Sequence, residues 1–180
     1  MRITVVGIGN ALAADDGVGI HAVAELRHMI HDERVRFLDS ERGGLDLLDH
    51  LAGSDIGILI DAAKTGIQPP GSPSEFTLQK PYTVGTPSSF HTIGLDAVLA
   101  FGEIIGMPLP NEVTVVAVEG SDFGTFRERL SDAVTTALPN LIGRVGNHLL
   151  TFVPDLRLSG GLDTLSAGAG TGFAQVSERT

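Results

Sequence analysis

The stretch that most constrains the fold is residues 3–19, because a buried strand there turns sharply into a helix. The apolar, β-branched run 3–6 is followed by Gly7-Ile8-Gly9-Asn10, and an amphipathic segment begins a few residues later. Two carboxylates, those of Asp15 and Asp16, fall at the start of that helix. The rest of the chain is expected to build on this strand, turn and helix.

Apolar runs and amphipathic segments alternate along the remaining sequence. Several of the runs show no polar alternation, which is typical of strands covered on both faces. The predicted strands cover residues 35–38, 56–60, 76–78 and 113–118, and the predicted helices cover 17–30, 45–51, 91–105 and 126–150. Pro139 is expected to kink or split the last helix. This order predicts an α/β fold, a three-layer sandwich with a mainly parallel twisted sheet in a single domain.

The length of 180 residues, of which 42% are hydrophobic, suits one sizeable core. From residue 154 the sequence becomes rich in Gly, Ser and Thr, and its few large apolar residues show no period. We therefore expect an α/β domain over residues 1–153 and a flexible C-terminal tail over 154–180.

The charge excludes some partners. The chain has 22 acidic and 12 basic residues, a net charge of −10 and a pI of about 4.8, which disfavours nucleic acid and anionic membranes. It has no cysteine, which excludes disulfides, thiolate metal sites and a cysteine nucleophile. The N-terminal apolar run is too short for a signal peptide or a spanning helix, so a cytoplasmic protein is expected.

Three residues that can bind a ligand fall at one edge of the predicted sheet. Asp16 follows the first strand, Asp61 closes the run 56–60, and His91 begins a helix. Strand ends and helix N-termini meet at this edge of a parallel sheet, so the three side chains are expected to converge. Two carboxylates and an imidazole suit a divalent ion such as nickel or zinc.

Each of these residues also has a purely structural interpretation. Asp16, or Asp15 beside it, can cap the helix, because an acid is favourable at a helix N-terminus. Asp61 can be a turn residue, and His91 an ordinary residue at a helix start. The residues alone leave these interpretations open.

A Gly-x-Gly after the first strand also suggests a dinucleotide-binding turn, with Asp39 as the ribose-binding acid. Leu12 stands where the third glycine belongs, and the carboxylates of Asp15 and Asp16 would repel a pyrophosphate. The chain also lacks the Gly-x-Ser-x-Gly turn of serine hydrolases and the glycine-rich phosphate loop. All three alternatives are disfavoured.

Three motifs together resemble those of the hydrogenase maturation endopeptidases. They are Gly7-Ile8-Gly9-Asn10 with Asp15-Asp16-Gly17-Val18-Gly19, then Asp61-Ala62, then Ser89-Phe90-His91-Thr92-Ile93-Gly94-Leu95. The resemblance covers about residues 1–150 in the same order and spacing. It implies an α/β sandwich and a peptidase that removes the C-terminal extension of a nickel–iron hydrogenase large-subunit precursor after nickel insertion.

The resemblance also implies roles for particular residues. Asp16, Asp61 and His91 are the expected catalytic and metal-contacting residues. The metal is nickel, which the precursor itself can supply and which zinc or cadmium can replace. Substrate contacts are implied at Gly9, Asn10, Gly43 and Gly44, although the flanking Arg42 and Leu45 depart from the family pattern.

A monomer in the cytoplasm is expected, with the precursor as its partner. The alternative from another class is a non-enzymatic acidic α/β module that binds a metal or a partner as carrier or scaffold.

Overall fold

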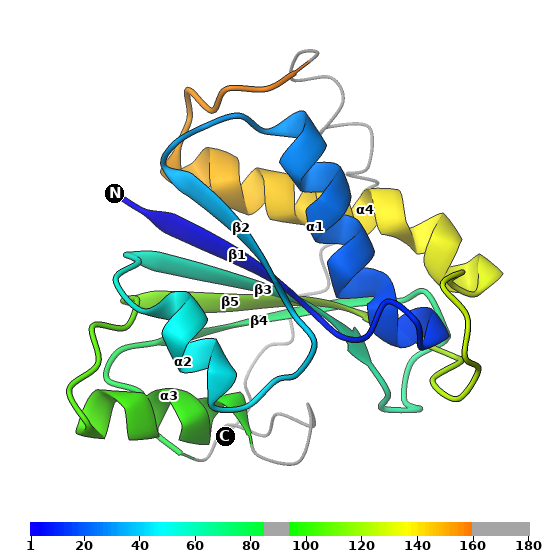
Figure 1. The fold of residues 1–180 in the computed structure, drawn as a ribbon, viewed down its shortest axis with the longest axis horizontal. Helices are drawn as coiled ribbons and strands as arrows, with labels where there is room; N and C mark the ends of the chain where they lie inside the picture. Colours follow the sequence, from blue (N-terminus) through cyan, green and yellow to red (C-terminus); the bar gives the residue numbers. More distant parts are fainter. Residues whose placement is uncertain (85–93, 160–180) are drawn as a thin grey trace, which may run out of the picture.

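The computed structural model describes residues 1–84 and 94–159. Within these residues, five strands form one sheet in the order β2-β1-β3-β5-β4 (Figure 1). Neighbouring strands are parallel except for β4, which pairs antiparallel with β5. The strands are β1 (Ile3–Ile8), β2 (Val35–Ser40), β3 (Ile56–Ala63), β4 (Pro73–Gln79) and β5 (Glu112–Glu119).

Helices cover both faces of this sheet. A 3₁₀ turn, η1 (Ala14–Gly17), leads into α1 (Val18–Met29), and the other helices are α2 (Asp46–Leu51), α3 (Leu95–Ile104) and α4 (Asp132–Phe152). Figure 1 shows α1 and α4 on one face and α2 and α3 on the other. The predicted three-layer α/β fold with a mainly parallel sheet is confirmed.

Alternate side chains of the central strands fill two separate cores. Ile3 and Val5 of β1 pack with α1 and α4, whereas Val6 and Ile8 pack with α2 and α3. Every residue of β1 and β3 is buried. Because both faces of these strands are covered, their sequences show no alternation of apolar and polar residues.

The prediction that the last helix begins at residue 126 is wrong. Helix α4 begins at Asp132, after Ser131, whose hydroxyl accepts a hydrogen bond from the Val134 N–H at 3.4 Å. Residues 120–131 form a loop because a buried carboxylate, described below, binds their backbone. Pro139 lies inside α4 without splitting it, since the apolar stripe of this helix packs on the sheet across the proline.

Residues 154–159 lie against the end of α1. Leu156 is buried, Leu158 forms a β-bridge with Ile30, and the Ser159 N–H donates to the Met29 carbonyl at 2.8 Å. The rest of the expected tail, 160–180, lies outside the described residues. The domain boundary after residue 153 stays a prediction.

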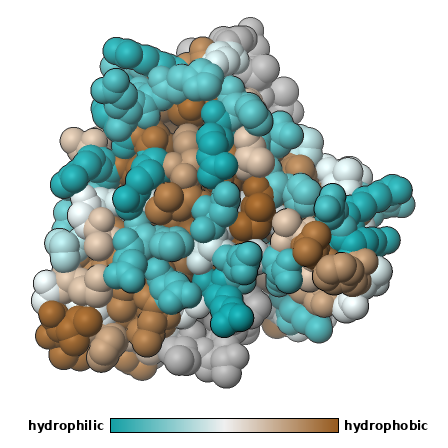
Figure 2. Space-filling model, in the orientation of Figure 1, coloured by the Kyte–Doolittle hydropathy of each residue, from teal (hydrophilic) through white to brown (hydrophobic). Residues whose placement is uncertain are grey.

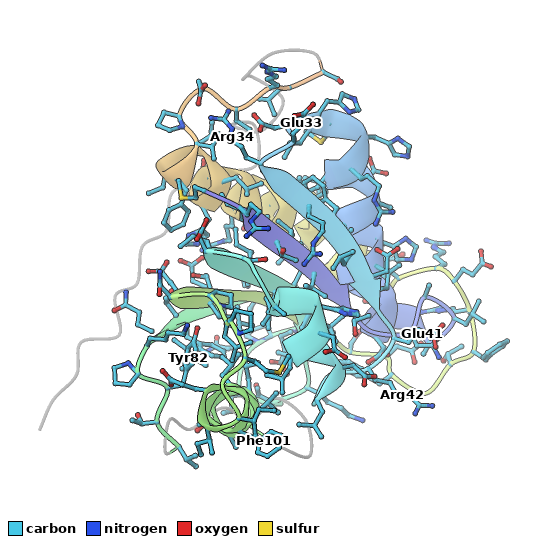
Figure 3. All side chains as sticks on the ribbon, turned by 60° about the vertical axis from the view of Figure 1, so that its left-hand side comes forward. Glu33, Arg34, Glu41, Arg42, Tyr82 and Phe101 are labelled. Carbon is cyan, nitrogen blue, oxygen red and sulfur yellow. The ribbon has the colours of Figure 1, made fainter. Side chains whose placement is uncertain are left out.

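The two ends of β2 lie far apart in the molecule. Figure 3 shows Glu33 and Arg34, which precede the strand, at one end, and Glu41 and Arg42, which follow it, at the other. None of the helices in the described part of the chain is long and apolar enough to cross a bilayer.

Candidate functional site

Helix α1 starts unusually close to the sheet because Gly19 lies at the contact. A Cβ on Gly19 would stand 2.4 Å from the carbonyl oxygens of both Ile8 and Ile60. These are backbone atoms of β1 and β3, so no side-chain movement could make room. The glycine-rich motif is therefore explained by helix packing and needs no bound nucleotide.

Gly9 allows the turn that positions Asp16. Its φ is +127°, and a Cβ at this position would come within 1.7 Å of the Asp16 carbonyl oxygen. The next residue, Asn10, donates its backbone N–H to Oδ2 of Asp16 at 2.8 Å. Two residues predicted to contact substrate, Gly9 and Asn10, thus adjoin a predicted catalytic acid.

Asp61 lies inside β3, where it pairs with Ala117 of β5. Its side chain is 4% exposed, and its Oδ1 accepts a hydrogen bond from the Ala62 N–H at 2.7 Å. Burial raises the pKa of Asp61 to about 7, the Ala62 hydrogen bond acts against this, and the charge of Asp16 adds to it. The two acids therefore lie close enough to interact.

The two acids meet where the direction of the chain changes. From β1 the chain crosses over α1 to β2, and it then returns over α2 on the other face to reach β3. Strand β1 is thus followed by a helix on one face, α1, whereas the next helix after β3, α3, lies on the other face, an arrangement that marks the ligand-binding edge of such sheets. Asp16 and Asp61 lie at this switch point, the usual ligand site of such sheets.

Asp15 has a different role from its neighbour Asp16. Its carboxylate is fully buried and accepts hydrogen bonds from the backbone of Ser121, Asp122 and Ser131. Burial acts to raise its pKa, but these hydrogen bonds outweigh burial and the pKa lies below its usual value. Neither acid caps the helix, since η1 and α1 have no side-chain cap.

Glu119 is a buried acid at the same edge that the sequence did not single out. It is 4% exposed and accepts hydrogen bonds from the Thr65 N–H at 2.8 Å, the Thr65 hydroxyl at 2.7 Å and the Gly66 N–H at 2.7 Å. Glu119 thereby holds the loop between β3 and β4. Like Asp61, Glu119 is an acid at the end of an apolar run. This position in the sequence does not by itself distinguish an acid that supports a loop from an acid of the reactive site.

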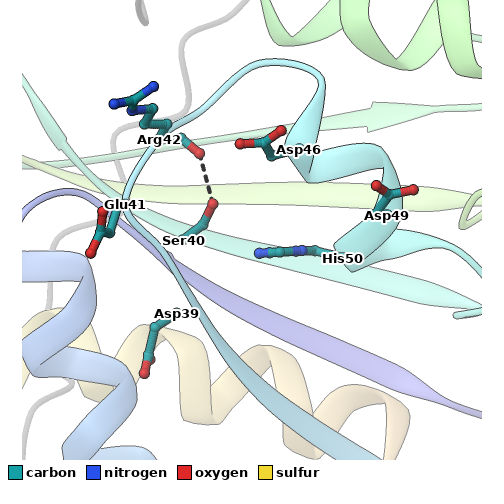
Figure 4. A pocket seen from close by; sticks show the side chains of 7 residues that line it. All are labelled: Asp39, Ser40, Glu41, Arg42, Asp46, Asp49 and His50. Carbon is teal, nitrogen blue, oxygen red and sulfur yellow. Dashed lines mark hydrogen bonds between the residues drawn. The ribbon is translucent and has the colours of Figure 1, made fainter.

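The predicted substrate residues Gly43 and Gly44 lie in the loop between β2 and α2. Beside this loop is a pocket of about 360 Å³ that carries four acidic side chains, one arginine and one histidine (Figure 4). The pocket is lined by Asp39, Ser40, Glu41, Arg42, Asp46, Asp49 and His50. Of Gly43 and Gly44, only Gly44 has a backbone conformation that favours glycine, with φ +86°.

The predicted metal ligands are only partly within the described residues. Among residues 1–84 and 94–159, no group of three or more His, Asp or Glu side chains is placed to hold a metal ion. His91 lies outside these ranges. Asp16 and Asp61 are brought together, whereas the full set with His91 stays a prediction.

Comparison with known proteins identifies the family. No model of a known protein family matches the chain. It is 33% identical over 151 residues to hydrogenase expression/formation protein HupD of Thiocapsa roseopersicina, covering 78% of this chain and 67% of that protein. It is 32% identical over 120 residues to hydrogenase 2 maturation protease of Escherichia coli (strain K12), covering 66% of this chain and 73% of the relative. The chain belongs to the hydrogenase maturation protease family.

A solved structure of this family shares the fold. The hydrogenase 2 maturation peptidase from Thaumarchaeota archaeon SCGC_AB-539-E09 superposes with a TM-score of 0.62 at 28% identity, covering 83% of this chain and 98% of that chain. The hydrogenase maturation proteases are peptide hydrolases, so both the family and the class of enzyme predicted from the sequence are confirmed.

Proposed function

We propose that this protein is an endopeptidase that removes the C-terminal extension from the large-subunit precursor of a nickel–iron hydrogenase after nickel insertion. The observation that carries the proposal is the pair formed by Asp16 and Asp61 at the switch point of the sheet. Membership of the hydrogenase maturation protease family supports the reaction and the class of substrate. The cytoplasmic location and the monomeric state expected from the sequence stay predictions.

The donor set fits a divalent cation. Burial of the Asp61 carboxyl, together with the nearby charge of Asp16, disfavours the ionised form of Asp61, and a cation beside it would remove that cost. In our proposal Asp16, Asp61 and His91 hold the nickel that the precursor carries, and zinc or cadmium can replace it. The ion would serve for recognition and would polarise a bound oxygen.

The side chain of Asp61 is suited to proton transfer near neutral pH. A general base works best when its pKa lies near the pH of the reaction, and burial raises the pKa of Asp61 to about 7. In the alternative in which Asp61 contacts no ion, we propose that a carboxyl oxygen of Asp61 takes the proton of the water that attacks the scissile carbonyl and passes it to the leaving amine. The carboxylate of Asp16 is fixed beside this site by the hydrogen bond from the Asn10 N–H.

Exposed apolar side chains around the acids support a protein as the substrate. Each loop that follows a parallel strand carries one of them on the edge where Asp16 and Asp61 lie. They are Leu12 after β1, Leu45 after β2, Ile67 after β3 and Phe126 after β5, with exposed fractions of 41%, 55%, 80% and 80%. In our proposal this apolar rim contacts the precursor around its scissile bond.

Ile67 and Ile104 provide a matched pair to test the apolar rim. Ile104 is 82% exposed at the end of α3, on the opposite edge of the sheet, and a hydrophobic patch lies over α3 at the lower left of Figure 2. Ile67→Ser is expected to raise KM for precursor cleavage roughly tenfold with kcat unchanged, because about 1.4 kcal/mol of apolar contact is lost. Ile104→Ser is expected to leave both constants unchanged. Equal effects of the two substitutions would contradict the proposal that the apolar rim contacts the precursor.

Mass spectrometry of the precursor tests the proposed reaction. The nickel-loaded precursor is expected to lose the mass of its extension on incubation with the protein, whereas nickel-free precursor stays intact. Asp16→Asn is expected to abolish the loss. A stable complex without loss of mass would instead support the non-enzymatic binding module. Isothermal titration adds a check: tight stoichiometric nickel binding by the protein alone would contradict recognition of precursor-bound nickel.

A further inference from the structure

The carboxylate of Asp15 is saturated with hydrogen bonds from one distant loop. Its Oδ2 accepts the Ser121 N–H at 2.8 Å, the Ser121 hydroxyl at 3.1 Å and the Asp122 N–H at 2.9 Å, and its Oδ1 accepts the Ser131 N–H at 2.7 Å. These donors follow β5 and lie more than 100 positions away in the sequence. One side chain thus joins the turn after β1 to both ends of the loop 121–131.

The backbones of the same two segments are also paired. The Asp15 N–H donates to the Asp122 carbonyl, the Ala14 N–H to the Arg127 carbonyl, and the Arg127 N–H to the Leu12 carbonyl, each at 2.9 Å. Ala14 takes a φ of +49°, which is unfavourable for a residue with a side chain. The loop 121–131 therefore holds η1 in a conformation that it would not adopt alone.

We propose that Asp15 is a positioning residue, which holds Asp16 in place by tying η1 to the loop 121–131. The inference rests on the proposed function, because it assigns Asp15 to the same reaction. Asp16 follows Asp15 directly within η1, and its own side chain is fixed locally by the Asn10 N–H. When Asp15 cannot bind the loop, η1 relaxes, and Asp16 leaves the position that it holds beside Asp61.

Asp15→Asn tests this role with little change in size. The amide replaces one acceptor oxygen by a donor, so at least one backbone N–H of the loop loses its partner. In our proposal the variant cleaves nickel-loaded precursor with kcat reduced roughly 10- to 100-fold at a temperature where it is fully folded, and with KM nearly unchanged. A wild-type kcat in this folded variant would overturn the proposal.

Asp32 is the matched control for loss of stability alone. It is also a buried carboxylate, 9% exposed, and it accepts hydrogen bonds from Arg34 and from the Arg157 N–H. It lies before β2, on the edge of the sheet opposite the acids. Asp32→Asn is expected to lower the melting temperature without changing kcat, and a reduction of kcat equal to that of Asp15→Asn would refute a specific role for Asp15.

Amide hydrogen exchange separates this proposal from the proposed function. The Asn10 N–H reports the position of the Asp16 carboxylate, to which it donates. Asp15→Asn is expected to speed its exchange at least tenfold, together with that of Ser121 and Ser131, whereas Asp32→Asn leaves it unchanged. Unchanged exchange at Asn10 in Asp15→Asn would overturn the positioning role, even if the protein cleaves the precursor. If wild-type protein fails to cleave, the proposed function fails and this exchange still decides the role of Asp15.

Discussion

Asp61→Asn is expected to make the metal-free protein more stable at pH 8 while abolishing cleavage of the precursor. The Asn side chain keeps an oxygen for the Ala62 N–H but carries no charge into a site that is 4% exposed. The expected gain in the free energy of unfolding is on the order of 4 kcal/mol, the cost of ionising a carboxyl whose pKa rises from 3.8 to about 7. A substitution that stabilises the fold and destroys activity marks a functional site.

The pH dependence follows from the direction of this pKa change. Below pH 3.8 the Asp61 carboxyl is protonated in both the folded and the unfolded chain. Between pH 3.8 and about 7 the unfolded chain ionises at Asp61 while the folded carboxyl keeps its proton, so the contribution of Asp61 to the stability of wild type falls as pH rises. Above this window the penalty is complete and constant.

Chemical denaturation in chelator between pH 4 and 8 measures this difference. The advantage of Asp61→Asn over wild type is expected to shrink as the pH falls and to vanish near pH 4. Asp16→Asn serves as the control, because removing the Asp16 charge should recover only part of the gain. Lower stability of Asp61→Asn than of wild type at pH 8 would contradict the electrostatic account.

Gly19→Ala is expected to destabilise the domain by roughly 4 kcal/mol or more. The added methyl group would meet the carbonyl oxygens of Ile8 and Ile60 at 2.4 Å and the Ile8 nitrogen at 2.6 Å. Relief requires α1 to move away from the sheet, which exposes fully buried side chains such as Val23 and Leu26. Thermal unfolding followed by circular dichroism measures the loss.

Gly43→Ala is the matched control for this substitution. A Cβ on Gly43 meets no atom within 4 Å, and its φ lies outside the range that favours glycine. The change is expected to leave the stability within about 1 kcal/mol of wild type, in the stabilising direction, because alanine restricts the unfolded chain. Equal destabilisation by both substitutions would show that close helix packing is not the cause.

The fold could be predicted because its strands are continuous apolar runs separated by helical segments. The run 56–60 predicted β3 and placed Asp61 at its end, and the strand continues through Asp61 to Ala63. The meeting of Asp16 and Asp61 follows from one rule, since parallel strands send their carboxyl ends to the same edge. No pattern in the sequence indicated that β4 is antiparallel to its neighbour. The direction of β4 depends on the path of the loop that connects it to β3.

The separate roles of Asp15 and Asp16 could not be predicted, since identical neighbouring residues differ only in what surrounds them. Asp15 owes its role to Ser121, which lies 106 positions away. The start of α4 was misplaced for the same reason. The apolar residues from Phe126 to Leu130 continue the helical spacing, yet Phe126 is 80% exposed on the loop that Asp15 binds.

The place of Asp61 within a strand has a consequence for how such a protease can diversify. Asp61 is a residue of β3, which is hydrogen-bonded to β5. Ile67 and Phe126, by contrast, lie in the connecting segments that follow β3 and β5. Residues 67–70, which precede the backbone hydrogen bonds of Gly71 and Ser72 to Glu119, can thus be lengthened or exchanged without changing the register of β3. Transplanting such segments between relatives offers a way to retarget the enzyme to another protein while its reactive centre is inherited intact.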